Sequence, residues 1–111
     1  HPLASLDRLN LWYFGVHDRR EEAVLDPATR ALTFDEVLTG LSPTEAVFEA
    51  GRCLSCGNCF ECDGCLGACP EGAVIKLGVG LRYEFDDARC TGCGACYRQC
   101  PVHAIDMIPE G

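Results

Sequence analysis

Residues 1–32 combine one strongly apolar run with a long charged stretch. The apolar run is LNLWYFGV (9–16), which holds the only tryptophan of the chain. The charged stretch DRREEAVLDPATR (18–30) follows it and has a turn signal at Asp26-Pro27. An apolar stripe within an otherwise charged segment packs against a surface, either of the same domain or of a partner. We therefore predict an arm over residues 1–32.

Two capping signals then predict two short helices over residues 33–52. Thr33 and Glu36 form a capping box at the start of FDEVLTG, and a glycine closes that segment. Ser42 and Glu45 form a second box with proline at the first helical position, and the helix TEAVFEAGR follows.

The pattern changes from helical to extended further along the chain. In AVIKLGVGLRYEF (73–85), two β-rich runs surround a Gly-Val-Gly turn, which predicts a β-hairpin. The apolar segment IDMI (105–108) is expected to form a closing strand. We therefore assign residues 1–52 to an N-terminal arm with two short helices, and residues 53–111 to a second domain.

An internal repeat is the most informative feature of this second domain. CFECDGCLGACPEGAV (59–74) matches CTGCGACYRQCPVHAI (90–105) at a constant offset. Both copies contain C-x2-C-x2-C-x3-C-P, so four cysteines and a proline coincide. Three thiolates spaced three residues apart let one loop wrap a compact iron–sulfur cluster, and the loop amides can donate hydrogen bonds to sulfur.

The fourth cysteine of each copy lies four residues after the third, so these two share one helical face. It points away from its own loop and can complete the cluster of the other copy, as it does in two-cluster proteins with this spacing. The repeat therefore predicts two [4Fe-4S] clusters with crossed ligand sets. Cluster I is assigned to Cys59, Cys62, Cys65 and Cys100, and cluster II to Cys90, Cys93, Cys96 and Cys69.

Two further cysteines leave a second ligand frame open. Cys53 and Cys56 have no counterpart in the second copy, but they could bind in place of Cys59 and Cys62, which would then lie in an expanded loop. We favour the compact frame because it repeats the second copy residue for residue. In that frame Cys53 and Cys56 are either buried thiols near cluster I or a spare pair that exchanges into the cluster or forms a disulfide.

The cysteine content by itself permits other interpretations. Ten cysteines in 111 residues are typical of a secreted disulfide scaffold, but adjacent CxxC thiols suit metal better than a disulfide framework. Structural zinc sites usually take two ligand pairs separated by a longer loop, which the triple run fits poorly. A zinc-bound interaction domain remains the second alternative.

The charge balance narrows the choice of partners. The chain has 9 basic and 17 acidic residues and a formal net charge of −8. This balance argues against nucleic acid or an anionic membrane as a partner, and fits either plain solubility or a basic protein partner. Because no apolar run reaches the roughly 18 residues of a membrane span, we expect no membrane insertion. We also expect no catalytic site in this chain, since no acid–base pair or nucleophile stands out.

The paired runs CFECDGCLGACP and CTGCGACYRQCP resemble the bacterial two-[4Fe-4S] ferredoxin domain. The longer stretch TEAVFEAGRCLSCGNCFECDGCLGACPEGAVIKL resembles the C-terminal ferredoxin extension of NAD(P)H-dependent iron–sulfur flavoproteins similar to the glutamate synthase small chain. The resemblance implies an α+β fold, a ferredoxin-like βαββαβ unit with pseudo-twofold symmetry. It also implies a flavoprotein or another redox protein as partner, although this sequence lacks a G-x-G-x-x-G dinucleotide fingerprint.

These observations predict one-electron transfer through two [4Fe-4S] clusters. The chain would act as a ferredoxin module or subunit of a larger oxidoreductase linked to flavin and NAD(P)H, or, as the alternative, as a freestanding low-potential ferredoxin. Labile clusters and free thiols fit a reducing compartment, so we expect a cytoplasmic location.

Overall fold

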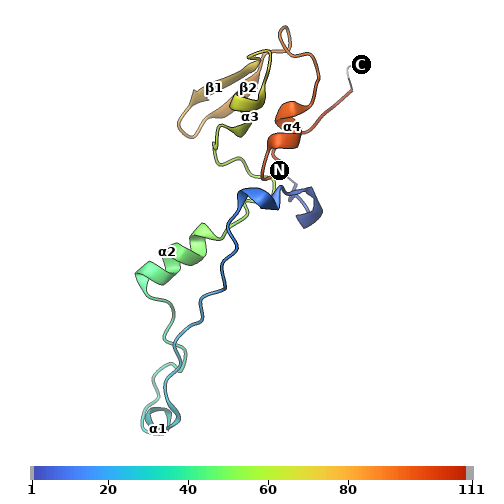
Figure 1. Ribbon diagram of the computed structural model, residues 1–111. Helices are drawn as coiled ribbons and strands as arrows, with labels where there is room; N and C mark the ends of the chain where they lie inside the picture. The colour runs from blue at the N-terminus through green and yellow to red at the C-terminus, as the bar shows by residue number, and fades with distance from the viewer. Residues whose placement is uncertain (1, 110–111) are drawn as a thin grey trace. The chain divides into compact units, whose positions relative to one another are not determined.

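The computed structural model describes residues 2–109, which divide into two compact units (Figure 1). One unit runs up to Gly15 and resumes at Leu54, and the other spans Val16–Cys53. The second change of unit coincides with the predicted boundary at residue 53. The first does not, because the residues up to Gly15 belong with the cysteine-rich part of the chain and not with the rest of the predicted arm.

The cysteine-rich unit is built on a β-hairpin and two short helices. Strands β1 and β2 pair antiparallel, with Val74 opposite Phe85, and this confirms the predicted hairpin (Figure 1). Helix α3 packs against both α4 and β1. The bounds of the elements are α3 (Gly64–Ala68), β1 (Val74–Gly78), β2 (Arg82–Phe85) and α4 (Ala95–Gln99).

The two helices reproduce the internal repeat. They are equally long, and their first residues, Gly64 and Ala95, occupy the same position in the two copies. Each ends at a cysteine in extended conformation, with ψ 113° at Cys69 and ψ 119° at Cys100. Proline follows both cysteines and disfavours the helical conformation in the residue before it, so the C-x3-C-P pattern itself sets the helix length.

The predicted closing strand at 105–108 is wrong, because the structure has no strand there. A strand needs a neighbour to pair its backbone groups. Symmetry would place that neighbour near residues 52–54, where the chain instead leaves the end of a helix. Over residues 2–109 the regular part of this unit is therefore α3-β1-β2-α4, and the complete βαββαβ fold stays a prediction.

The N-terminal segment packs on this same unit through the apolar run identified in the sequence. Its short 3-10 turns are η1 (Leu6–Arg8) and η2 (Leu11–Tyr13). Leu9 between them is buried, and the Asn10 side chain donates to the carbonyls of Arg98 and Cys100 at 2.8 and 2.7 Å. The other buried apolar residues of the described chain are few: Cys65, Ala73, Val74, Cys100 and Val102.

The unit Val16–Cys53 contains α1 (Pro27–Arg30) and α2 (Pro43–Gly51). The capping box of α2 is confirmed, because the Ser42 hydroxyl accepts from the Glu45 amide at 3.3 Å and the Glu45 carboxylate accepts from the Ser42 amide at 3.0 Å. The helix predicted after Thr33 is wrong. Residues 37–39 instead pair with residues 23–25 through an isolated bridge.

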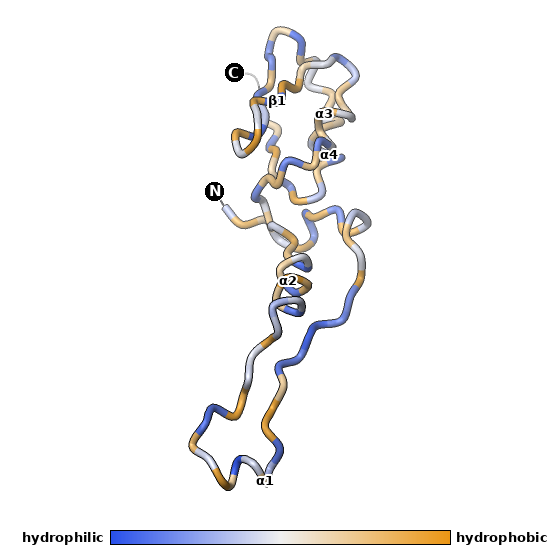
Figure 2. The backbone as a smooth tube through the Cα atoms, turned by 90° about the vertical axis from the view of Figure 1, so that its left-hand side faces the viewer, coloured by the Kyte–Doolittle hydropathy of each residue, from blue (hydrophilic) through white to orange (hydrophobic). Residues whose placement is uncertain are grey.

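Apolar side chains of this unit remain exposed. No residue of Val16–Cys53 is buried, and the Phe34 side chain is fully exposed. Figure 2 shows hydrophobic positions distributed along its backbone among polar ones. Phe48 has partners within the unit, since the Arg20 guanidinium lies 4.2 Å from its ring centre and the His17 ring 5.5 Å away. Over residues 2–109 no helix is long and apolar enough to cross a membrane.

Candidate metal centre

Two cavities in the cysteine-rich unit are each bordered by four cysteines. The first has a volume of about 110 Å³ and is lined by set I, which comprises Cys59, Cys62, Cys65 and Cys100. The second has a volume of about 30 Å³ and is lined by set II, which comprises Cys69, Cys90, Cys93 and Cys96. Each set takes three cysteines from one copy of the repeat and the fourth from the other. Cys53 and Cys56 line neither cavity.

Backbone amides donate to the sulfur atoms at equivalent positions of both copies. The first cysteine of each copy accepts from the amide two residues later, and the fourth accepts from the amide four residues later. Hydrogen bonds of this kind stabilise a thiolate and therefore favour metal ligation. The donor–acceptor pairs are Glu61–Cys59 at 3.5 Å, Gly92–Cys90 at 3.4 Å, Ala73–Cys69 at 3.3 Å and Ala104–Cys100 at 3.3 Å.

The free thiols differ in acidity according to their surroundings. Burial raises the pKa of Cys65 to about 11 and also raises the pKa of Cys96. The amide of Ala73 lowers the pKa of Cys69. A metal binds the thiolate form, so loading of these cysteines releases protons.

Set II is the more exposed of the two. In every pair of cysteines that the repeat aligns, the set II member is more accessible than its set I counterpart. Cys90 and Cys93 are exposed, whereas Cys59 and Cys62 are half-buried. Cys65 and Cys100 are buried, and their counterparts Cys96 and Cys69 are half-buried.

The two cysteine loops share an unusual backbone conformation but differ in the residues that adopt it. The first copy places Glu61 and Asp63 in the left-handed region, with φ 61° and 62°. The second copy places Gly92 and Gly94 at the matching positions, with φ 67° and 70°. Glycine adopts this conformation at no steric cost, whereas a residue with a side chain does so only where other contacts hold it.

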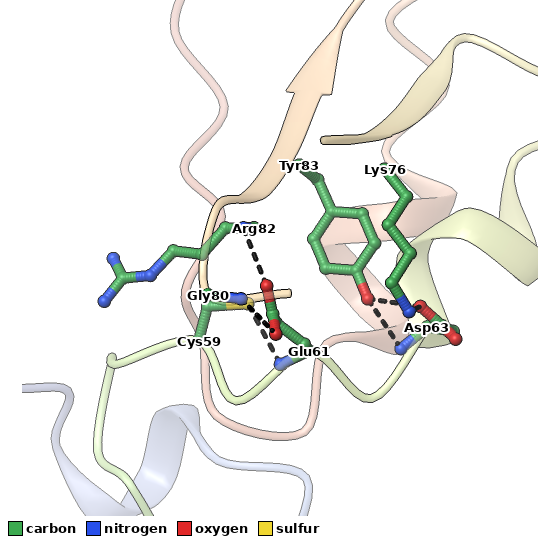
Figure 3. A network of polar contacts seen from close by, with 7 residues as sticks. All are labelled: Cys59, Glu61, Asp63, Lys76, Gly80, Arg82 and Tyr83. Carbon is green, nitrogen blue, oxygen red and sulfur yellow. Dashed lines mark hydrogen bonds and ion pairs between the residues drawn. The ribbon is translucent and has the colours of Figure 1, made fainter. Parts of the chain in front are cut away.

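Glu61 is held by the turn of the hairpin. Its carboxylate accepts from the amides of Gly80 and Arg82 at 3.0 and 2.8 Å (Figure 3). These bonds, that of Gly80 first, lower the pKa of Glu61. The carboxylate therefore fixes the first cysteine loop to the hairpin in its charged form.

Asp63 is held by side chains from both strands. The Lys76 ammonium lies 2.7 Å from its carboxylate, and the Tyr83 hydroxyl donates to the same oxygen and accepts from the Asp63 amide at 3.0 Å (Figure 3). Lys76 first and then Tyr83 lower the pKa of Asp63. Burial and the bond to Asp63 raise the pKa of Tyr83.

Sequence analysis missed this network and also missed Phe85, which lines both cavities. A signal for the network is visible in the repeat, because Glu61 and Asp63 align with glycines of a loop that needs positive φ. The partners of these two carboxylates lie far along the chain in the hairpin, so the spacing of the motif does not reveal them.

The residues present fit two [4Fe-4S] clusters. Each set offers four thiols, which is the ligand number and type of such a cluster, and amides already donate to the sulfur atoms. Within residues 2–109 no three His, Cys, Asp or Glu side chains are grouped closely enough to hold a single metal ion.

Comparison with known proteins identifies the second copy of the repeat. Residues 83–106 match the 4Fe-4S binding domain family. That range contains β2 from Tyr83 onward, helix α4 and the whole run C-x2-C-x2-C-x3-C-P of the second copy. No solved structure matches the chain.

Iron–sulfur subunits are among the curated relatives. Pyruvate synthase subunit PorD of Methanothermobacter marburgensis is 45% identical over 53 residues, which are 48% of this chain and 59% of PorD. The formate dehydrogenase-O iron-sulfur subunit of Escherichia coli is 42% identical over 56 residues, 48% of this chain and 18% of the subunit.

A third relative extends over more of the chain. The iron-sulfur C subunit of the CoB--CoM heterodisulfide reductase of Methanopyrus kandleri is 36% identical over 79 residues, which are 58% of this chain and 41% of that relative. The matched part thus spans between about a fifth and three fifths of these three relatives. Residues 83–106 therefore form a 4Fe-4S binding domain, within a chain that is similar over about half its length to subunits of redox enzymes.

Proposed function

We propose that this chain transfers electrons through two [4Fe-4S] clusters with crossed ligands. Set I would hold one cluster and set II the other. Helices α3 and α4 would each contribute to both clusters, because the third cysteine lies within each helix and the fourth directly follows it. The main support is that each of the two cavities is bordered by one complete crossed set of four cysteines.

A bound [4Fe-4S] cluster supplies reversible one-electron transfer. The chain's own residues hold the thiolates in place and donate amide hydrogen bonds to them. Cys65 and Cys100 of set I are kept away from water by burial, and Phe85 borders both sites. The described part of these sites presents thiols and apolar side chains and no arrangement for acid–base chemistry, so we assign no substrate reaction to it.

We further propose that the chain works inside a larger oxidoreductase. The relatives named above are subunits by their printed names, and the exposed apolar side chains of Val16–Cys53 fit a chain that packs against others. A flavoprotein partner linked to NAD(P)H follows from the resemblance of residues 44–77 to the ferredoxin extension of such enzymes. Neither partner nor substrate is carried over from the relatives, because the matched part covers too little of them.

A reductive titration tests the proposed function. Anaerobically purified chain is titrated with a low-potential reductant and followed by visible absorption and electron paramagnetic resonance. We expect uptake of about two electrons per chain, one for each cluster, with recovery of the starting spectrum on reoxidation. A chain that holds iron and sulfide but takes up no electrons reversibly would contradict the proposal.

A further inference from the structure

We propose that the surface around the set II loop docks a redox protein whose own centre is bordered by lysine or arginine side chains. This set II face consists of Glu71, Asp87, Thr91, Gly92 and Cys93. The inference rests on the proposed electron-transfer function and specifies where the chain meets its partner and what kind of surface that partner presents.

Accessibility distinguishes the two cysteine loops. The segment Asp87–Cys93 is exposed at every residue, and it includes two of the four set II cysteines. The corresponding first-copy cysteines, Cys59 and Cys62, are half-buried. A partner that approaches set II can therefore reach the cysteines of the loop directly.

The set I loop is covered by other parts of the chain. The hairpin lies over it through the bonds of Glu61 and Asp63, which Figure 3 shows with Lys76 and Tyr83 around them. The Tyr13 ring lies 5.8 Å from the ring of Phe60, between the first two set I cysteines. A partner at this loop would have to displace contacts that the chain already makes.

The residues that align with this covering are small in the second copy. Thr91 takes the place of Phe60, Gly92 that of Glu61, and Gly94 that of Asp63. Each replacement removes a large or charged side chain next to a cysteine. The set II loop thus allows the close approach on which electron exchange depends.

The charges on the set II face are incompletely balanced. Glu71 lines the set II cavity and Asp87 lies in the turn before Cys90; both are exposed, and their carboxylates make no hydrogen bond or ion pair within residues 2–109. Asp86 in the same turn is paired with Arg89 at 3.2 Å, and Arg98 beside Gly94 offsets part of the remaining charge.

At the set I loop, by contrast, the carboxylates of Glu61 and Asp63 are already bonded within the chain. The net charge of −8 and the thiolates of a loaded set II add to the negative potential of the set II face. A cationic rim on the partner is therefore the complementary surface.

Binding and cross-linking of a basic redox protein test this face without relying on turnover. The probe is mitochondrial cytochrome c, a haem protein with lysines around its exposed haem edge. We expect carbodiimide, which joins carboxylates to lysines, to link the probe to Glu71 and Asp87, as mapped by mass spectrometry. Absence of binding at low salt, or cross-links confined to carboxylates outside the face, would overturn the proposal.

A charge reversal with a matched control sharpens the test. Glu71→Lys/Asp87→Lys should weaken the affinity for the probe by about tenfold at low salt. Asp35→Lys/Glu36→Lys makes the same change in net charge at exposed positions of the other unit, and should weaken it by no more than about threefold. Equal losses in the two double variants would mean that net charge alone, and not this face, governs binding.

A second matched pair tests the position of contact independently of charge. Thr91→Trp adds bulk over set II, and Phe60→Trp adds it at the aligned position over set I. We expect only Thr91→Trp to weaken the affinity and to slow reduction of the probe. An effect of Phe60→Trp equal to or larger than that of Thr91→Trp would overturn the proposal.

The outcome separates the docking face from the proposed function. Every variant is compared with the parent chain for iron, acid-labile sulfide and reversible reduction before binding is measured. A variant that keeps its clusters and its full affinity contradicts the docking face and leaves electron transfer intact. A parent chain that binds the probe but takes up no electrons reversibly contradicts the proposed function instead.

Discussion

At the scale of single residues, Cys69 and Cys100 carry the crossed arrangement. Each ends a helix in its own copy of the repeat, yet it lines the cavity formed by the other three cysteines of the opposite copy. Proline after each cysteine ends the helix and so fixes where the sulfur lies. The spacing of the repeat led to the same two groups of four, because helix geometry determines where a residue four positions later lies.

Removal of Cys69 should therefore cost one cluster. In the Cys69→Ala variant we expect iron to fall from about eight to about four atoms per chain, because set II keeps only three thiolates. Iron and acid-labile sulfide are measured in protein purified without oxygen.

The control for this variant replaces the two cysteines that line neither cavity. Cys53→Ser/Cys56→Ser should retain about eight iron atoms per chain. Loss of one cluster in this double variant would select the expanded ligand frame, in which Cys53 and Cys56 take the place of Cys59 and Cys62.

At the scale of elements, local signals predicted the structure only where nothing competed with them. The Ser42 capping box opens α2 as expected. The box at Thr33 fails because residues 37–39 pair with residues 23–25, a contact between distant segments that a local motif does not encode. The strand expected at 105–108 fails for the related reason that no strand of the described chain lies beside it.

The contact between the hairpin and the first cysteine loop predicts a specific loss of stability. Tyr83→Phe removes the hydroxyl that bonds both the amide and the carboxylate of Asp63. We expect the Tm of the loaded chain to fall by roughly 5 °C, the shift that about 1 kcal/mol produces in a domain of this size.

Tyr97→Phe is the matched control, since the Tyr97 hydroxyl makes no hydrogen bond to residues 2–109. Its Tm, measured by differential scanning calorimetry, should stay within about 1 °C of the parent value. Equal shifts for the two variants would show that the Tyr83 hydroxyl does not stabilise the loop.

The capping box of α2 predicts a pH dependence. The bond from the Ser42 amide lowers the pKa of Glu45 below its ordinary value of 4.5. The charged carboxylate therefore stabilises the helix above that value, and the stabilisation is lost as the pH falls through the lowered pKa of the folded state. Protection of the Ser42 amide against hydrogen exchange should follow this titration, and Glu45→Gln should remove the pH dependence. An unchanged pH profile in Glu45→Gln would refute the assignment.

At the scale of the whole molecule, the N-terminal segment belongs to the cysteine-rich unit. Sequence analysis grouped residues 1–52 as one arm because charged residues separate the apolar run from the cysteines. In the structure Leu9 is buried and Asn10 bonds the carbonyls at the end of α4. Packing of this kind between distant parts of the chain is not visible in a single sequence, so the boundary at Gly15 could not be predicted.

Two leucines of this segment test the assignment. Leu9→Ala should lower the free energy of unfolding of the loaded chain by about 2–3 kcal/mol, because the side chain is only 8% exposed. Leu3→Ala should change it by less than about 0.5 kcal/mol, because Leu3 is 86% exposed. Denaturant unfolding under anaerobic conditions measures both. Equal losses would separate the segment from the unit.

The content of iron and acid-labile sulfide tests the central claim most directly. Two [4Fe-4S] clusters in crossed sets predict about eight iron and about eight sulfide per chain in anaerobically purified protein. About four of each would contradict the second site, and zinc without sulfide would contradict both.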